Sequence, residues 1–263
     1  HSPGLTPETM SQNPFSFVTA NLVAQPLGFD MPKGWQQGDE ASNAYYRPLD
    51  TFEARFGAML REVKSLGFDA IDLWCAHLHW RWATLEHVAI AKRLLESEGI
   101  SVVSYPAWVG GDASDLRGAC RLCQELGVDL IAGHIELATT DRDAAVRILR
   151  EAGVGYGIEN HTETSIEELA ERLGEGDADV IGIALDTGWS GTRQWDALKG
   201  LDALYDRIFA VHLKDVKAKR AEPSGYQFID WGHETCTLGD GVVPVEAVVK
   251  ELRRRGFRGP IGI

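Results

Sequence analysis

The chain has 263 residues and a formal net charge of −13 at neutral pH, with a sequence pI near 5.0. This length is enough for one large domain with a well-buried core. The negative charge argues against extended nucleic acid as a substrate, because proteins that bind a phosphate backbone usually carry a basic patch. The sequence contains no run of 18 or more apolar residues and does not begin with an export signal. We therefore expect a cytoplasmic protein without membrane contact, formed by one domain over 1–263, with 1–14 as a flexible N-terminal extension.

The four cysteines are expected to be reduced thiols, because they are scattered through a large chain without secretory signals. Cys120 and Cys123 form a C-x-x-C pair inside a helical pattern, where a spacing of three residues marks one face of the helix. No second cysteine pair completes a zinc site. Packing is therefore the preferred interpretation over a redox or metal role.

Short apolar runs alternate with amphipathic stretches along the chain, which predicts a parallel sheet covered by helices. The predicted strands are Phe15–Val23, Ala70–Trp74, Ser101–Tyr105, Asp129–Gly133, Val154–Glu159, Val180–Asp186, Ile208–Leu213 and Pro260–Ile263. The predicted helices are Thr51–Leu66, Thr84–Glu98, Asp115–Leu126, Arg142–Ala152, Ser165–Leu173, Trp195–Tyr205 and Val245–Arg255. Most are followed by a glycine that can take the left-handed position after a helix, namely Gly67, Gly99, Gly127, Gly153 and Gly256. This order predicts an α/β protein with a (β/α)8 barrel, in which the chain ends within the eighth strand before a final helix.

Two predicted connections are longer than the usual loops between a strand and a helix, and both lie on the predicted catalytic rim. They cover Ala24–Asp50 after the first strand and Lys214–Pro244 after the seventh. Both are rich in aromatic residues: Phe29, Trp35, Tyr45 and Tyr46 in the first, and Tyr226, Phe228 and Trp231, with His233, in the second. We interpret them as lids or substrate walls, with subunit contacts as the alternative.

Three polar residues each close a predicted strand, at intervals of about 26 residues. They are Glu159, Asp186 and His212. Successive parallel strands of a barrel deliver the residues at their ends to one rim, and two carboxylates with one imidazole suit a divalent metal ion. Such a set leaves open positions for substrate oxygens, which favours proton abstraction next to a carbonyl through an enediolate. The alternative, that each carboxylate only caps the next helix, is weaker for three residues in register.

Four short motifs, taken together and in order, resemble a known family. They are Gly157–His161 (GIENH), Ala184–Gly188 (ALDTG), Val211–Asp215 (VHLKD) and Leu238–Pro244 (LGDGVVP). The chain resembles the sugar phosphate isomerase/epimerase proteins of the xylose isomerase-like TIM barrel superfamily from its second strand to its eighth. The family name is not matched by a phosphate site here, because no cluster of basic residues or glycine-rich anion cradle is visible.

The resemblance implies a divalent ion held by Glu, Asp, His and a second Glu on strands five to eight. The first three would correspond to Glu159, Asp186 and His212, and the fourth is expected directly after Ile263. We expect the ion to be Mn²⁺, with Mg²⁺, Co²⁺ or Zn²⁺ as alternatives. In relatives that isomerise or epimerise sugars, two ligand carboxylates remove and return a proton, and we expect Glu159 to be one of them.

Two residues close to the predicted ligands are candidates for the chemistry. His161 follows Glu159 by two residues and is a candidate catalytic base or hydroxyl-binding group, with a structural role as the alternative. Lys214 follows His212 by two residues and could neutralise a developing oxyanion or an anionic substrate group. A salt bridge between Lys214 and Asp215 is the equally plausible alternative.

The remaining candidates are substrate-binding residues at other strand ends. Sugars bind through hydrogen bonds combined with contacts between their apolar faces and aromatic rings. By this criterion, the candidates are His77, Trp108, His134 and Trp189.

The sequence is compatible with more than one enzyme class. The leading hypothesis is a metal-dependent sugar isomerase or epimerase with a small-molecule sugar as its substrate. We expect such an enzyme to act as a homo-oligomer or with a partner subunit. A lyase acting on an oxidised sugar is the alternative, since relatives include keto-inositol dehydratases and subunits of C-glycoside deglycosidases that begin with the same proton abstraction. An abasic-site endonuclease is less favoured because of the negative charge, and a non-catalytic barrel that stabilises a partner is a fourth hypothesis.

Overall fold

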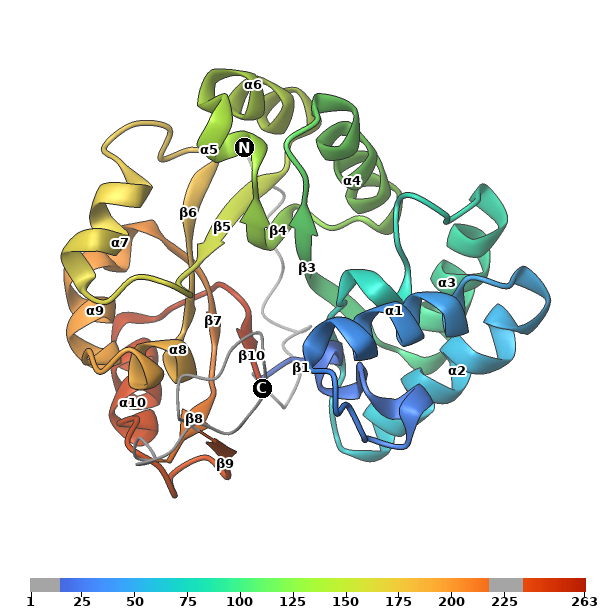
Figure 1. The fold of residues 1–263 in the computed structure, drawn as a ribbon, viewed down its shortest axis with the longest axis horizontal. Coiled ribbons are helices and arrows are strands. Elements are labelled where there is room, and N and C mark those ends of the chain that lie inside the picture. Colours follow the sequence, from blue (N-terminus) through green and yellow to red (C-terminus); the bar gives the residue numbers. More distant parts are fainter. Residues whose placement is uncertain (1–14, 218–233) are drawn as a thin grey trace.

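Eight parallel strands form the centre of the protein in a computed structural model that describes residues 15–217 and 234–263. Their order in the sheet follows their order in the chain. Figure 1 shows the strands surrounded by helices. The strands are β1 (Phe17–Val18), β2 (Ala70–Asp72), β3 (Ser101–Val109), β4 (Leu130–Ile135), β5 (Gly155–Glu159), β6 (Ile181–Asp186), β7 (Ile208–His212) and β10 (Ile261–Gly262). The predicted (β/α)8 barrel is confirmed.

The sheet closes on itself where β10 lies between β7 and the first strand. Gly262 pairs with His212 on one side and forms a parallel bridge with Ser16 on the other. Three backbone hydrogen bonds of 2.9 Å, two of them made by Ser16, link the segment around β10 to the segment around β1. A Cβ atom on Gly262 would lie 2.6 Å from Val18 Cγ2, so only glycine permits this close approach.

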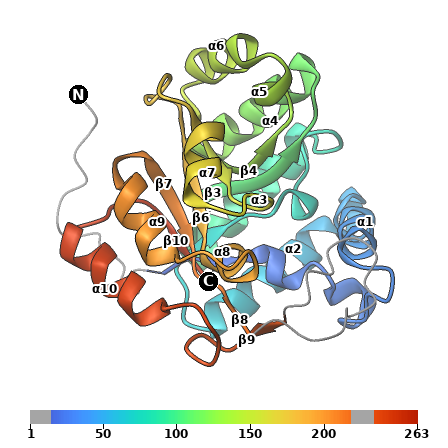
Figure 2. The same cartoon turned by 60° about the vertical axis from the view of Figure 1, so that its left-hand side comes forward.

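The helices cover the outside of the barrel (Figure 2). They are α1 (Trp35–Tyr46), α2 (Leu49–Ser65), α3 (Leu85–Glu98), α4 (Ala113–Leu126), α5 (Leu137–Thr140), α6 (Arg142–Ala152), α7 (Ile166–Leu173), α8 (Thr187–Thr192), α9 (Ala197–Leu204) and α10 (Val245–Arg255). All seven predicted helices are present, and the five glycines predicted to follow them have positive φ angles. Side-chain caps fix several helix starts, as Ser165 does when it accepts from the Glu168 N–H.

The prediction for the first strand was wrong in its second half. The strand ends at Val18, and Thr19–Leu22 forms a short 3-10 helix. The buried Thr19 hydroxyl accepts a hydrogen bond from the Trp74 N–H at 2.8 Å and lies 3.1 Å from His77 Nδ1. These contacts turn the chain, and a run of apolar residues cannot reveal them because they come from a segment more than 50 residues away.

The two predicted long connections contain regular structure. The first includes α1, which starts at Trp35 without a side-chain cap and therefore lacks the usual sequence signal of a helix start. In the second, β8 (Asp215–Val216) pairs antiparallel with β9 (Thr235–Cys236). The aromatic residues predicted there, Tyr226, Phe228 and Trp231, lie with His233 outside the described residues, as do residues 1–14.

The aromatic residues of the first connection differ in exposure. Phe29 is exposed, Trp35 and Tyr45 are each 37% exposed, and Tyr46 is buried. The Trp35 ring lies 5.7 Å from Trp74, and the Tyr46 ring lies 5.0 Å from His77. Part of this connection therefore packs against the β2 end of the barrel.

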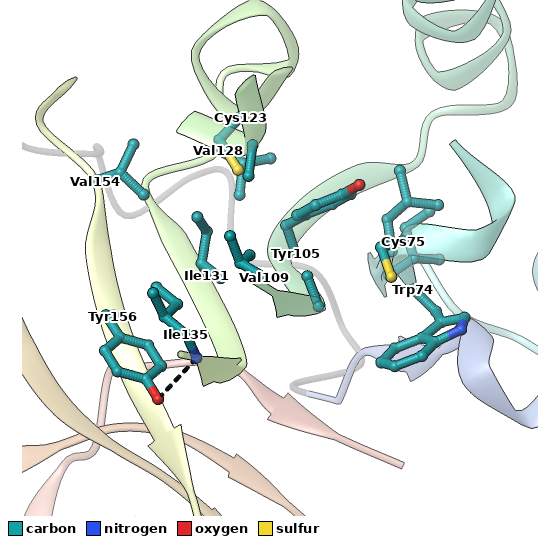
Figure 3. Close-up of a cluster of buried hydrophobic side chains, with 14 of the residues drawn as sticks. Trp74, Cys75, Tyr105, Val109, Cys123, Val128, Ile131, Ile135, Val154 and Tyr156 are labelled. Carbon is teal, nitrogen blue, oxygen red and sulfur yellow. Dashed lines mark hydrogen bonds between the residues drawn. The ribbon is translucent and has the colours of Figure 1, made fainter. Parts of the chain in front are cut away.

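The hydrophobic core lies between the strands and the helices that cover them (Figure 3). Cys120 and Cys123 are buried on α4, in keeping with the packing interpretation of the C-x-x-C pair. No helix among the described residues combines the length and apolar character needed to cross a membrane.

One carboxylate joins the loops that follow β2 and β3. Asp115, in the first turn of α4, accepts hydrogen bonds from Trp80 Nε1, from the Arg81 guanidinium and from the Gly110 N–H. Burial alone would raise the pKa of Asp115, but these donors lower it to about 2. The charged form is therefore stabilised by folding.

We expect Asp115→Asn to lower the free energy of unfolding at pH 7 by about 1–2 kcal/mol, because the amide cannot serve all these donors. Because the folded pKa lies below the unfolded value of about 3.9, this contribution is present above pH 4 and disappears as the pH falls toward 2. Urea unfolding of the wild type and the variant at pH 7 and at pH 3 measures this difference in the free energy of unfolding. Asp143→Asn, an exposed carboxylate in the first turn of α6, is the matched control, and an equal loss in both variants would contradict the prediction.

Candidate metal centre

Glu159, Asp186 and His212 close three neighbouring strands and meet at one rim of the barrel. One ligand atom from each lies within 4.8 Å of the others, and they are the one such group found in the described residues. Asp186 pairs directly with His212, whereas Glu159 pairs with Ala184, two residues before Asp186. Since residues two apart on a strand share a face, the register places all three side chains on the same face.

Small residues lie next to these side chains, one step further into the barrel on the same face. Ala184 and Ala210 precede Asp186 and His212 by two residues and pack in a separate small cluster with Leu130 and Ala132. On this face, Asp186 and His212 are each preceded by an alanine, and Glu159 is preceded by Gly157. The space at the rim is left to the polar groups.

Glu159 and His212 form an ion pair in the triad, whereas the charge on Asp186 is disfavoured. His212 Nδ1 lies 3.5 Å from Glu159 Oε1. Burial would lower the pKa of His212, but Glu159, Asp72 and Asp186 together raise it to about 9. Burial would raise the pKa of Glu159, but His212, His161 and Lys214 lower it. Burial raises the pKa of Asp186, and Glu159 adds to this effect.

Asp72, a residue that the sequence analysis did not single out, lies behind His212. It is completely buried at the end of β2 and accepts hydrogen bonds from the hydroxyls of Ser16 and Ser104. Its Oδ1 lies 4.0 Å from His212 Nε2, a buried nitrogen with no hydrogen-bond partner in the described part of the chain. The signal in the sequence was a single aspartate inside the apolar run Ala70–Trp74.

The residues near the triad form a row of rings along the rim. The His161 ring lies 4.2 Å from Trp189 and 6.0 Å from the half-exposed Trp108. Lys214 Nζ lies over the Trp189 ring, 4.3 Å from its centroid. Burial lowers the pKa of His161, while Glu159 acts in the opposite direction.

Lys214 and Asp215, which the sequence allowed to form a salt bridge, point to different partners. The buried Asp215 carboxylate accepts from the N–H groups of Gly239, Gly241 and Val243. A Cβ atom on Gly241 would lie 2.2 Å from Asp215 Oδ1, so glycine is needed here for the backbone to approach the carboxylate. The glycine-rich motif thus holds the segment after β7 through Asp215.

The other predicted substrate-binding residues occupy different surroundings. His77 is completely buried, and burial lowers its pKa to about 4. Its Nε2 has no partner among the residues described. His134 is half-buried at the end of β4, with its Nδ1 3.2 Å from an Arg172 nitrogen. The structure therefore brings His134, His161, Trp108, Trp189 and Lys214 to the rim and encloses His77 beside β1.

These observations describe a closed α/β barrel with a candidate metal centre at the carboxyl ends of its strands. A family model described as xylose isomerase-like TIM barrel matches residues 60–263. The chain belongs to this family. No curated protein sequence matches the chain closely enough to be counted as a relative.

Solved structures share the fold at low sequence identity. The probable 3-DHS dehydratase AsbF of Bacillus anthracis is 14% identical with a TM-score of 0.65, over 95% of this chain and 91% of its own. The 3-keto-D-glucoside 4-epimerase YcjR of E. coli is 14% identical with a TM-score of 0.55, over 79% and 85%. A xylose isomerase-like TIM barrel protein from Mycobacterium smegmatis in complex with magnesium is 15% identical with a TM-score of 0.63, over 80% and 81%.

The donor set fits a divalent cation. Two carboxylates and one imidazole are ligands that Mn²⁺, Mg²⁺, Co²⁺ and Zn²⁺ accept in different degrees. The His212 nitrogen that faces Glu159 is Nδ1, and its other nitrogen faces the buried Asp72. A carboxylate behind a ligating histidine commonly orients the ring and raises its basicity.

We therefore expect Asp72→Asn to weaken Mn²⁺ binding about tenfold, because the amide no longer stabilises a polarised His212 N–H. Glu159→Gln and Asp186→Asn should weaken binding more, since each removes a charged donor. Isothermal titration of metal-free protein measures these affinities, with circular dichroism to check folding. Glu136→Gln, at an exposed residue directly after β4, is the control. Wild-type affinity in Asp72→Asn would refute the assignment of this carboxylate.

Proposed function

We propose that the protein is a divalent-metal-dependent sugar isomerase or epimerase that transfers a proton through an enediolate. The observation that carries the proposal is the convergence of Glu159, Asp186 and His212 within 4.8 Å at the barrel rim. Glu159, Asp186 and His212 would hold the ion, which we propose is Mn²⁺. When bound, the ion would polarise a substrate carbonyl and so acidify the neighbouring C–H bond.

Glu159 is the proposed base for this proton. Its lowered pKa keeps the side chain as a carboxylate at neutral pH, which is the form that accepts a proton. The proton leaves the carbon next to the carbonyl, and its return to the adjacent carbon or to the other face gives the isomer or the epimer. His161 lies close enough to influence Glu159 electrostatically and is the proposed second group that moves a proton at the substrate oxygens.

The rim supports a small sugar as the substrate. Trp108 and Trp189 flank His161 and offer ring faces to the apolar side of a sugar. Lys214, above Trp189, is the proposed group that stabilises negative charge on a substrate oxygen. We also propose a cytoplasmic location, in keeping with its unpaired cysteines.

The proposal predicts that the protein exchanges a substrate C–H proton with solvent. In D₂O, the wild-type protein with Mn²⁺ should incorporate deuterium into a ketose or 3-keto-sugar, as followed by NMR. Removal of metal with EDTA should abolish exchange, and Mn²⁺ should restore it. Glu159→Gln should lower the rate by about 10²–10⁴-fold, a typical range for general base catalysis. Exchange that persists in Glu159→Gln would exclude Glu159 as the base.

A lyase acting on an oxidised sugar is the second candidate. The observation that favours a lyase is that His161 and Lys214 both act electrostatically on Glu159. A proton donor beside the base can protonate a leaving group. Incubation with a 3-keto-sugar and a keto-glycoside separates the candidates. An epimer or isomer as the product supports the first, whereas loss of water or aglycone without epimer supports the lyase.

A further inference from the structure

Arg172, a residue on α7 that the proposed chemistry does not use, reaches across the rim to His134. One terminal nitrogen of its guanidinium donates to Glu163 Oε1 at 2.7 Å and to the Glu159 carbonyl oxygen at 3.4 Å. The other terminal nitrogen lies 3.2 Å from His134 Nδ1. The Glu163 side chain is only 6% exposed, so the guanidinium is anchored by a buried carboxylate.

This contact determines which nitrogen of His134 carries the proton. A guanidinium has only donors and stays protonated, so His134 Nδ1 must be the acceptor. Burial, and after it the charge of Arg172, lower the pKa of His134, which keeps the ring neutral at neutral pH. A neutral imidazole that accepts at Nδ1 carries its proton on Nε2.

The backbone around His134 is fixed as well. Gly133 has a φ of 131°, and a Cβ atom there would lie 2.5 Å from the Ala107 carbonyl oxygen. The buried Tyr156 hydroxyl accepts from the Ile135 N–H at 3.1 Å (Figure 3). The same hydroxyl donates to the Gly133 carbonyl at 3.4 Å. The residues on both sides of His134 are thus tied to one side chain of β5.

His134 stands beside the candidate metal centre. Gly133 pairs with Ile158, so the next residues along the two strands are His134 and Glu159. The ring is half-buried and lies 6.5 Å from Trp108, which also contacts His161. Because Arg172 covers Nδ1, the ring nitrogen that remains for a ligand is Nε2.

We propose that Arg172 is a positioning residue that holds His134 as the neutral Nε2–H tautomer, so that Nε2 donates a hydrogen bond to a substrate oxygen. This inference rests on the proposed function for the identity of that ligand, a hydroxyl or carbonyl oxygen of a sugar. A neutral N–H donor polarises an oxygen without competing with Glu159 for the substrate proton. The role differs from that of His212, whose Nδ1 faces the candidate cation site.

Nitrogen-15 NMR of the histidine side chains at pH 8 tests the tautomer without metal or turnover. Wild-type protein should show the Nε2–H pattern for His134, assigned by its disappearance in His134→Gln. Arg172→Met should convert this pattern to a mixture of tautomers. Arg150→Met, at an exposed arginine paired with Asp179, should leave it unchanged. An Nδ1–H pattern in the wild type, or an unchanged pattern in Arg172→Met, would overturn the proposal, and the wild-type result needs no variant to fold.

Kinetics with the 3-keto-sugar tests the donor role. Loss of one hydrogen bond to the substrate should raise KM about tenfold in His134→Leu, which has no donor, and Arg172→Met should raise KM as well. An unchanged KM in both variants would refute the donor role. If the wild type turns over no sugar, the proposed function fails, whereas the tautomer pattern still decides the positioning role of Arg172.

Discussion

The register of β5, β6 and β7 is the constraint on which the candidate site depends. A shift of one residue in any of these strands would turn its terminal side chain to the opposite face. The pairing of Asp186 with His212, and of Glu159 with Ala184, instead places all three on one face. Closure of the barrel through Gly262 then brings Asp72 of β2 against the back of His212. The polar cluster is therefore a consequence of strand alignment around a closed sheet.

Buried charges in this cluster need a nearby opposite charge, and Glu159 and His212 provide one for each other. Glu159 and His212 stabilise each other's charged forms, whereas burial disfavours the charge on Asp186. Such a cluster is costly without a cation and favourable with one, because a divalent ion neutralises both carboxylates. The surrounding polar contacts, from the serines on Asp72 to Arg172 on His134, fix the groups before a ligand arrives. Rigid strands rather than loops carry most of these residues.

Most of the barrel could be predicted from the sequence, because apolar runs and amphipathic helices repeat with clear periods and glycines mark the helix ends. The predictions failed where the pattern was weak or where distant contacts decided the backbone. Thr19–Leu22 looked like a strand, yet the Thr19 hydroxyl binds the Trp74 backbone and the segment turns into a 3-10 helix. The helix Trp35–Tyr46 has no capping side chain, so its start carries no signal in the sequence. The first case reflects a tertiary contact that the local pattern does not encode, and the second reflects a missing signal for a helix start.

The sequence by itself determined the strand ends at Glu159, Asp186 and His212, since each is a polar residue after an apolar run. Only the tertiary structure decided which other residues approach them. Asp72 lies far from the triad in the chain and meets His212 because the sheet closes, whereas Arg172 of α7 reaches His134 and the Glu159 carbonyl through its long side chain. Conversely, His77 follows a strand end like the other candidates but is enclosed by Thr19 and Tyr46. The orientation of a side chain depends on its neighbours in space, which a one-dimensional pattern does not specify.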